Sequence, residues 1–189
     1  FLPKDVWIRG FGNLQTSPFL GDFNRDGKTD WGIFDNGTWR IAYSNGTDGF
    51  HSPVTWKTGF GAAGDRPVAG DFNGDGLLDA GIFKSSTGRW EIALSNGSGF
   101  GAQTVWHASF GANQTPFSGD FNGDGLLDIL AVSESTGAWR VALSNGSAFL
   151  DRGIWASNFG AGKQPVVFDC NGDGVTDIGF YDYASGTIQ

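Results

Sequence analysis

The sequence repeats itself with a period of about 49 residues. In each repeat a Phe-Gly pair and a proline precede an acidic segment of the form Asp-x-Asn-x-Asp-Gly-x-x-Asp. In the first three repeats, a Trp-containing run that ends in Ser-Asn-Gly follows this segment. The first aspartates of the four acidic segments are Asp22, Asp71, Asp120 and Asp169. A period between about 20 and 50 residues is typical of solenoids, propellers and arrays, so the repeat restricts the fold more than any other feature.

Each repeat consists of short apolar runs broken by Gly, Asn and Asp, and no run keeps helical spacing. Glycine accounts for 32 of the 189 residues, which indicates many tight turns. Asn-Gly between two runs is the strongest short hairpin signal, because both central turn residues need positive φ. In the second repeat we expect strands at roughly Pro67–Gly70, Ala80–Lys84, Trp90–Ser95 and Thr104–His107. Four short antiparallel strands per repeat predict an all-β chain built as a β-propeller, with one four-stranded blade per repeat and four repeats in the chain.

The chain is cut out of register with the repeat, because residues 1–7 align with residues 149–155. We expect a closing strand at about 1–9, units at about 10–58, 59–108 and 109–157, and an incomplete unit at 158–189. The offset fits ring closure by an N-terminal strand and equally a cut through a longer array. The ring would be completed within the chain, by a second copy of it, or by the rest of a longer propeller. Since the chain contains no Met, we expect it to be a processed or excised piece.

The acidic segments predict four calcium sites, because positions 1, 3, 5 and 9 of a tight loop carry oxygen-bearing side chains. Three carboxylates within nine residues repel one another unless a cation lies between them, so turn formation alone does not account for four such loops. There is no Glu at position 12, which excludes an EF-hand, and no His or Cys ligand pattern for zinc. The predicted ligands, with a backbone carbonyl at position 7, are Asp22, Asn24, Asp26, Lys28 (carbonyl) and Asp30; Asp71, Asn73, Asp75, Leu77 (carbonyl) and Asp79; Asp120, Asn122, Asp124, Leu126 (carbonyl) and Asp128; and Asp169, Asn171, Asp173, Val175 (carbonyl) and Asp177.

These motifs resemble a known repeat family. The segments FGAAGDRP, FGANQTP and FGAGKQP, each followed by an acidic loop, are similar to the FG-GAP or VCBS-type repeat of integrin α-chain propellers and of many secreted bacterial and fungal proteins. The order of elements is also similar to that of fungal fruiting-body lectins, which are calcium-binding seven-bladed propellers. The resemblance covers essentially the whole chain and implies a propeller fold, bound calcium and a secreted, extracellular location. This chain departs from it with GNLQTSP in the first repeat, with Cys170 in place of Phe, and with four repeats instead of seven.

The charge of the chain bears on its partners. Twelve Lys and Arg against 20 Asp and Glu give a formal net charge of -8, and no basic run occurs, so nucleic acid is not expected as a partner. No apolar stretch reaches the ~20 residues of a membrane span, so we expect no membrane insertion. Twelve of the 20 acidic residues belong to the four loops, so bound calcium would offset the net charge and would leave acidic sugars open as ligands.

No constellation of catalytic residues is visible in the sequence. His51 and His107 occupy non-equivalent positions of the repeat, and only two Glu, Glu91 and Glu134, are present. No nucleophile elbow, zinc-protease motif or phosphate-binding loop occurs, so the chain is not expected to be an enzyme.

Aromatic residues give the better functional indication, since sugars stack on aromatic rings beside a few polar groups. Trp39, Trp90 and Trp139 recur at one position of the repeat and are tentative sugar platforms, although packing between blades is the favoured interpretation. The non-repeated loop residues that are candidate rim contacts are Arg66, Asn113, Gln114, Lys163 and Gln164. Together these features favour a calcium-binding, non-catalytic propeller that binds a glycan or a cell-surface glycoprotein. The alternative is a structural, protein-binding or adhesion module excised from a larger secreted protein or enzyme.

Overall fold

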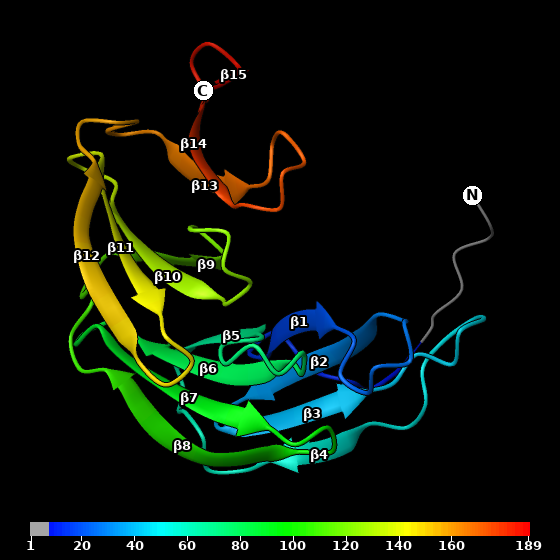
Figure 1. Ribbon diagram of the computed structural model, residues 1–189. Coiled ribbons are helices and arrows are strands. Elements are labelled where there is room, and N and C mark those ends of the chain that lie inside the picture. The colour runs from blue at the N-terminus through cyan, green and yellow to red at the C-terminus, as the bar shows by residue number, and fades with distance from the viewer. Residues whose placement is uncertain (1–7) are drawn as a thin grey trace. The chain divides into compact units, whose positions relative to one another are not determined.

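The computed structural model describes residues 8–189, which form strands, turns and loops without a helix (Figure 1). Residues 1–7, which include Trp7 and most of the predicted closing strand, lie outside the described residues. The strands group into four antiparallel sheets, in each of which consecutive strands are neighbours. This up-and-down order is that of a propeller blade, and the four sheets are the blades of a β-propeller. Over the described range, no helix is long and apolar enough to cross a membrane.

The bounds of the strands follow the repeat. The first sheet contains β1 (Ser17–Gly21), β2 (Asp30–Asp35), β3 (Thr38–Ala42) and β4 (Val54–Lys57). The second contains β5 (Arg66–Gly70), β6 (Asp79–Lys84), β7 (Arg89–Ser95) and β8 (Phe100–His107). The third contains β9 (Thr115–Gly119), β10 (Asp128–Ser133), β11 (Ala138–Ser144) and β12 (Phe149–Ala156). The fourth, among the described residues, contains β13 (Gln164–Phe168), β14 (Asp177–Asp182) and β15 (Thr187–Ile188).

The four strands predicted for the second repeat are present, but the last one starts earlier than predicted. β8 begins at Phe100, whereas the sequence predicts a start at Thr104. The backbone N–H of Asn96 donates to the carbonyl oxygen of Gly99 at 3.1 Å, which closes the turn directly after β7. The chain therefore returns to a strand almost at once, at Phe100.

Of the two Asn-Gly turns in the first repeat, only one has the predicted positive φ at both residues. Asn36 and Gly37, between β2 and β3, both have positive φ (47° and 88°), as a two-residue hairpin turn requires. In the turn after β3 only Gly46 has positive φ (76°). Asn45 acts there through its side chain, whose Oδ1 accepts hydrogen bonds from the backbone N–H and the hydroxyl of Thr47 at 2.9 and 3.0 Å.

The described chain divides into two compact units, and the division passes through the second sheet. One unit holds the chain up to Gly70 together with Gly76–Ile82 and Ile92–Thr104. The other holds Asp71–Asp75, Phe83–Glu91 and Val105–Gln189. Each unit is described below by itself.

Both units have an aromatic and aliphatic core built from the second and third strands of their sheets. In the first unit Phe34, Trp39 and Ile41 pack with Phe60 and Ile82. Both faces of β2 are covered, so its sequence between the terminal aspartates is a continuous apolar run, whereas in β3 the buried Trp39 and Ile41 alternate with the half-buried Thr38 and Arg40. In the second unit the core cluster contains Phe121, Leu130, Val132, Trp139 and Val141.

The repeated Trp of the third strand is part of this core, and the tentative assignment as a sugar platform is wrong. Trp39, Trp90 and Trp139 are 0%, 0% and 1% exposed, so no ligand reaches their rings. Each indole N–H donates to the carbonyl oxygen of a Phe-Gly phenylalanine, and the three acceptors are Phe60 (2.9 Å), Phe110 (3.3 Å) and Phe159 (2.8 Å). The Phe-Gly pair is thus a structural partner of the Trp.

Candidate functional site

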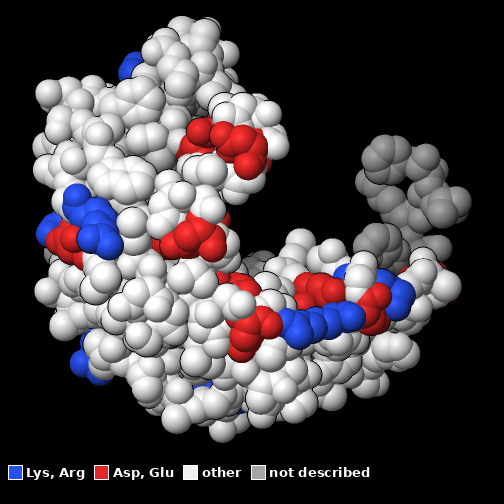
Figure 2. All heavy atoms as spheres, in the orientation of Figure 1, with Lys and Arg blue, Asp and Glu red and all other residues white. Residues whose placement is uncertain are grey.

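Each acidic loop joins the first two strands of its sheet. The aspartate at position 9 of every loop is the first residue of the second strand, so the loop ends where strand pairing begins. Figure 2 shows the Asp and Glu side chains gathered in clusters instead of spread evenly over the visible surface. The loops therefore concentrate negative charge at the strand ends.

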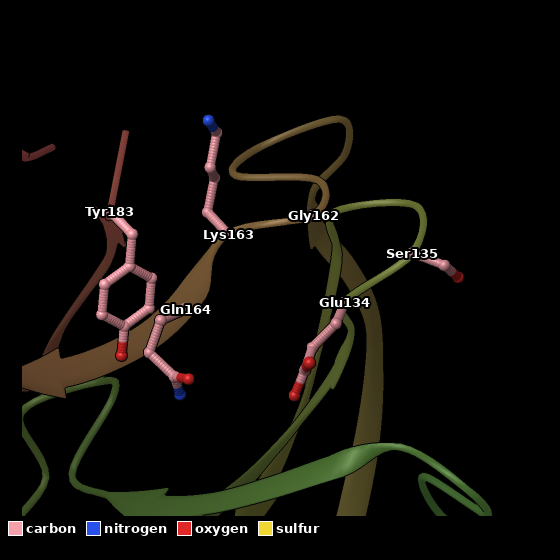
Figure 3. A pocket seen from close by; sticks show the side chains of 6 residues that line it. All are labelled: Glu134, Ser135, Gly162, Lys163, Gln164 and Tyr183. Carbon is pink, nitrogen blue, oxygen red and sulfur yellow. The ribbon is translucent and has the colours of Figure 1, made fainter. Parts of the chain in front are cut away.

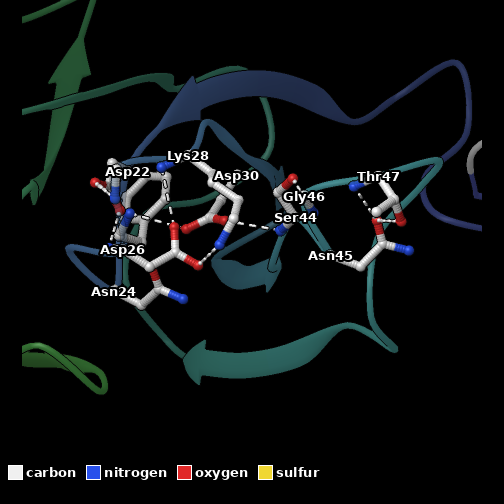
Figure 4. Close-up of polar contacts among 11 residues, drawn as sticks. Asp22, Asn24, Asp26, Lys28, Asp30, Ser44, Asn45, Gly46 and Thr47 are labelled. Carbon is white, nitrogen blue, oxygen red and sulfur yellow. Dashed lines mark hydrogen bonds and ion pairs between the residues drawn. The ribbon is translucent and has the colours of Figure 1, made fainter.

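The first loop is folded around its own carboxylates (Figure 4). Asp22 accepts hydrogen bonds from the backbone N–H groups of Asp26 and Gly27 at 3.1 and 2.8 Å. Asn24 Oδ1 accepts a further bond from the Asp26 N–H at 3.1 Å. The Lys28 ammonium lies 2.8 Å from Asp26 Oδ2, and this contact lowers the pKa of Asp26 and raises that of Lys28. An internal cation thus already contacts one of the carboxylates of this loop.

The third and fourth loops repeat this geometry without a lysine. Asp120 accepts hydrogen bonds from the N–H groups of Gly123 and Gly125 at 2.7 and 2.8 Å. In the fourth loop Asp169 accepts bonds from the two equivalent glycines at 2.7 and 2.9 Å, which lowers its pKa. In the second loop Asp71 accepts a hydrogen bond from the backbone N–H of Gly74 at 2.7 Å.

The aspartate at position 9 has a different environment. Asp30 is fully buried, and its two oxygens accept hydrogen bonds from the backbone N–H groups of Phe23 (2.9 Å) and Ser44 (2.8 Å). The buried Asp128 accepts from the two equivalent N–H groups at 3.0 and 2.7 Å. Burial raises the pKa of Asp30, and it raises that of Asp128 to about 6 against the opposing effect of these bonds. Position 9 therefore ties the acidic loop to the end of the third strand.

The oxygen atoms of the loop side chains are suitable ligands for a hard cation. Carboxylate, amide and carbonyl oxygens are the ligands that calcium prefers, and the residues at positions 1, 3 and 5 lie near the surface. Within residues 8–189, no three His, Cys, Asp or Glu side chains are gathered closely enough to hold a metal ion, because the carboxylates face backbone N–H groups instead. Calcium binding would exchange part of these hydrogen bonds for metal contacts. Cys170, in the fourth loop, donates from Sγ to Asp177 Oδ2 at 2.8 Å, which raises the pKa of the thiol.

A cavity of about 380 Å³ lies in the second unit, beside the turn between β10 and β11. The backbone N–H of Gly162 donates to the carbonyl oxygen of Glu134 at 2.7 Å, which holds the loop before β13 against this turn. The residues that line the cavity are Glu134, Ser135, Gly162, Lys163, Gln164 and Tyr183.

The side chains of this cavity are not equally placed for binding (Figure 3). Those of Glu134, Gln164 and Tyr183 extend toward the same side, whereas those of Lys163 and Ser135 point away. The Lys163 ammonium lies 2.9 Å from Asp182 and lowers the pKa of that carboxyl group. The ring of Tyr183 is 76% exposed. A carboxylate, an amide and an open aromatic ring therefore converge on one cavity, as small-molecule sites require.

The candidate rim residues have different positions. Lys163 and Gln164 line this cavity, while Asn113 and Gln114 line a neighbouring one, and Arg66 lies at the start of β5 and lines neither. The sequence reasoning missed Glu134 and Tyr183. These two residues occupy the same position of the repeat, where the second repeat has Ser85, so a departure from the repeat was the available signal.

The cavity and the acidic loops lie at opposite ends of the strands. β10 begins at Asp128, the last residue of the third acidic loop, and ends at Ser133, directly before Glu134. Six residues of extended strand span roughly 17–20 Å. The third acidic loop and the cavity are therefore connected through the length of the sheet and not by direct contact.

His107 lies close to Asp151 and Arg140, whose charges act on its imidazole. His107 packs against Phe110, and burial lowers its pKa. The nearby Asp151 is held by Arg140 through two hydrogen bonds, and these bonds contribute to the lowered pKa of its carboxyl group. The backbone N–H of Ser109 donates to Nδ1 of His107 at 3.1 Å.

Comparisons with known proteins agree with this fold. No curated protein sequence matches the chain. Among solved structures, the chain is similar to an Agrocybe aegerita lectin that specifically recognises non-reducing terminal N-acetylglucosamine, with 22% identity and a TM-score of 0.69 over 93% of this chain and 51% of the lectin. It is also similar to the Tc holotoxin pore of Photorhabdus luminescens, with 15% identity and a TM-score of 0.66 over 94% of this chain and 9% of that one. The chain thus spans about half the length of the lectin, and at these identities the likeness shows the fold alone.

The sequence itself matches a family model. The model of the FG-GAP-like repeat matches residues 22–82 and 120–180, which together make up more than half of the chain. Each matched segment starts at the first aspartate of an acidic loop and extends into the next repeat. The chain therefore belongs to the family of FG-GAP-like repeat proteins.

Proposed function

We propose that this chain is an extracellular, calcium-binding β-propeller module that binds carbohydrate and has no catalytic activity of its own. The observation that carries the proposal is the convergence of Glu134, Gln164 and the exposed ring of Tyr183 on one cavity. An aromatic ring covers the apolar C–H face of a sugar, while a carboxylate and an amide fix its hydroxyl groups.

Two features of the site, the Glu134 carboxylate and the Tyr183 ring, support sugar binding. One oxygen of Glu134 accepts from the hydroxyl of Thr115, and the other accepts no hydrogen bond from residues 8–189. The rings of Tyr183 and Tyr181 are perpendicular, with their centroids 4.9 Å apart, and Tyr183 is 76% exposed. The carboxylate is thus anchored on one side and free to accept a ligand hydroxyl on the other.

The similarity to the Agrocybe aegerita lectin supports the choice of the first probe, N-acetylglucosamine. The lining residues suit this sugar, because Gln164 offers an amide to an acetamido group and Glu134 accepts from hydroxyl groups.

Calcium has a structural role in this proposal. The positions 1, 3 and 5 of each loop and the carbonyl at position 7 would hold the ion, and position 9 would tie the loop to the sheet. A cation that binds the folded chain but not the unfolded chain stabilises the fold by an amount that grows with the logarithm of its free concentration above the dissociation constant. Lys28 competes with calcium for Asp26 in the first loop, so this loop is expected to bind the ion more weakly than the third.

A glycan array, probed in calcium and in excess chelator, tests the proposal. We expect binding to glycans that end in N-acetylhexosamine, strongest with calcium present. An array on which no glycan binds under either condition would contradict the carbohydrate-binding function.

A second candidate function, protein binding or adhesion, is favoured by the outer strand of the third sheet. β12 exposes the side chains of Leu150 and Ile154. Exposed apolar groups that lie close together mark surfaces for protein contact. Binding of a glycoprotein that survives enzymatic removal of its glycans would favour this second candidate.

A further inference from the structure

We propose that the cavity beside Glu134 is one half of a longer groove, and that the ligand is a neutral oligosaccharide whose second sugar binds against Asn113, Gln114 and Thr115. The proposal rests on the carbohydrate-binding function and extends it from one sugar to at least two. It assigns a binding role to the loop before β9, which the first cavity does not include.

A second cavity of about 280 Å³ lies on the other side of the β10–β11 turn. It shares Glu134 and Ser135 with the first cavity, so the two meet along this turn. Small-molecule sites have volumes of about 300–1,000 Å³, and each cavity alone is near the lower end of this range. A ligand that occupies both cavities therefore uses the site better than a single sugar does. The lining residues of the second cavity are Asn113, Gln114, Thr115, Val132, Ser133, Glu134 and Ser135.

Glu134 connects the two cavities. The hydroxyl of Thr115, in the second cavity, donates to one oxygen of its carboxylate. In Figure 3 the Glu134 side chain extends to the same side as Gln164 in the first cavity. The carboxylate is thus held at the boundary, where it accepts hydroxyl groups from neighbouring sugars of one chain.

Gln114 gives an independent indication that the second cavity takes a ligand. Its Oε1 is buried and accepts no hydrogen bond within the described chain. A buried carbonyl oxygen without a donor is unfavourable, and a ligand donor in the cavity removes this penalty once the Gln114 amide turns toward it. A sugar hydroxyl or the N–H of an acetamido group is such a donor.

The charge of the second cavity restricts the class of sugar. Its lining contains the Glu134 carboxylate and no Lys, Arg or His. A carboxylated or sulfated sugar would bring a second negative charge next to Glu134 without a cation to balance it. The second cavity therefore favours neutral sugars rich in hydrogen-bond donors, such as the units of β-linked N-acetylglucosamine oligomers.

Isothermal titration with N-acetylglucosamine, its β1,4-linked dimer and its trimer tests the inference on the calcium-loaded chain. We expect the dimer to bind at least about tenfold more tightly than the monomer, since it adds one buried hydrogen bond and further contact area. Equal affinity of monomer and dimer would overturn the inference and leave the proposed function standing. If no sugar binds, the proposed function itself fails, and the inference with it.

Variants at Gln114 test whether the higher affinity for the dimer comes from the second cavity. Gln114→Leu removes the buried acceptor at similar size, and Gln114→Glu adds a negative charge there. We expect both variants to bind the monomer as the parent chain does and to lose the tenfold gain for the dimer. Gln103→Leu, on the exposed part of β8, is the matched control and should retain the gain. A dimer preference that survives both Gln114 variants would contradict the assignment.

Discussion

The indole N–H of Trp39 donates a hydrogen bond to the carbonyl oxygen of Phe60 at 2.9 Å, and the two rings stack with their centroids 5.6 Å apart. The N–H of Phe60 in turn donates to the carbonyl oxygen of Gly37, in the turn that precedes the Trp strand. The same two hydrogen bonds recur around Trp90 and Trp139. The Phe-Gly pair of each repeat therefore holds the turn between the second and third strands of a sheet. In the third sheet, the candidate sugar site lies next to this turn.

Replacement of Trp139 by Phe is expected to destabilise the chain by about 2–4 kcal/mol. The change leaves the carbonyl oxygen of Phe159 without its donor and opens a cavity in the core. Urea denaturation measures the loss. Trp155→Phe is the matched control, because Trp155 is 46% exposed and should cost no more than about 0.5 kcal/mol. Equal losses for the two variants would contradict the structural role of the repeated Trp.

The two kinds of loop aspartate are expected to respond differently to calcium. Asp128→Ala leaves two buried N–H groups without an acceptor and should cost about 2–5 kcal/mol even in excess chelator. Asp124→Ala removes an exposed carboxylate and should cost little in chelator, at most about 0.5 kcal/mol, but lower the stability gained from calcium. Thermal melts of both variants with calcium and with chelator make the comparison. Similar losses in chelator would show that position 9 is not a structural clamp.

Calcium itself is expected to stabilise the parent chain. At a free concentration about 100 times its dissociation constant, each occupied site adds about 2.7 kcal/mol to the free energy of unfolding. The melting temperature should therefore rise with added calcium and fall again in excess chelator. An unchanged melting temperature across this titration would contradict the four predicted calcium sites.

The buried Asp128 also predicts a pH dependence of stability in calcium-free buffer. Its pKa rises from the ordinary 3.8 to about 6 on folding, so the folded chain binds more protons than the unfolded chain between these values. The contribution of Asp128 to the free energy of unfolding is therefore greatest below about pH 4 and falls as pH rises to about 6, by at most about 3 kcal/mol. The difference between the parent chain and Asp128→Asn, measured by urea denaturation across this range, isolates the effect. A difference that does not change between pH 4 and 6 would contradict the raised pKa.

The repeat made most of the fold predictable, because the strands, the turns and the acidic loops are features that all units share. The sequence favours packing for Trp39, Trp90 and Trp139 but leaves a sugar platform open, since a Trp beside polar residues suits a core or a binding surface; their burial decides for the core. Glu134 and Tyr183 could not be predicted from what the units share, because the cavity is formed where the units differ. The contact of Lys28 with Asp26 likewise depends on a residue that the third loop replaces with Leu.

The most direct test of the account is isothermal titration of N-acetylglucosamine into the calcium-loaded chain and two glutamate variants. Glu134→Gln removes the carboxylate that the cavity offers to sugar hydroxyl groups and should weaken binding about tenfold or more. Glu91→Gln removes the same charge from β7, where Glu91 pairs with Arg89, and should bind as the parent chain does. If the parent chain binds the sugar and Glu134→Gln binds it equally well, the sugar site is not at Glu134 and the central claim is wrong.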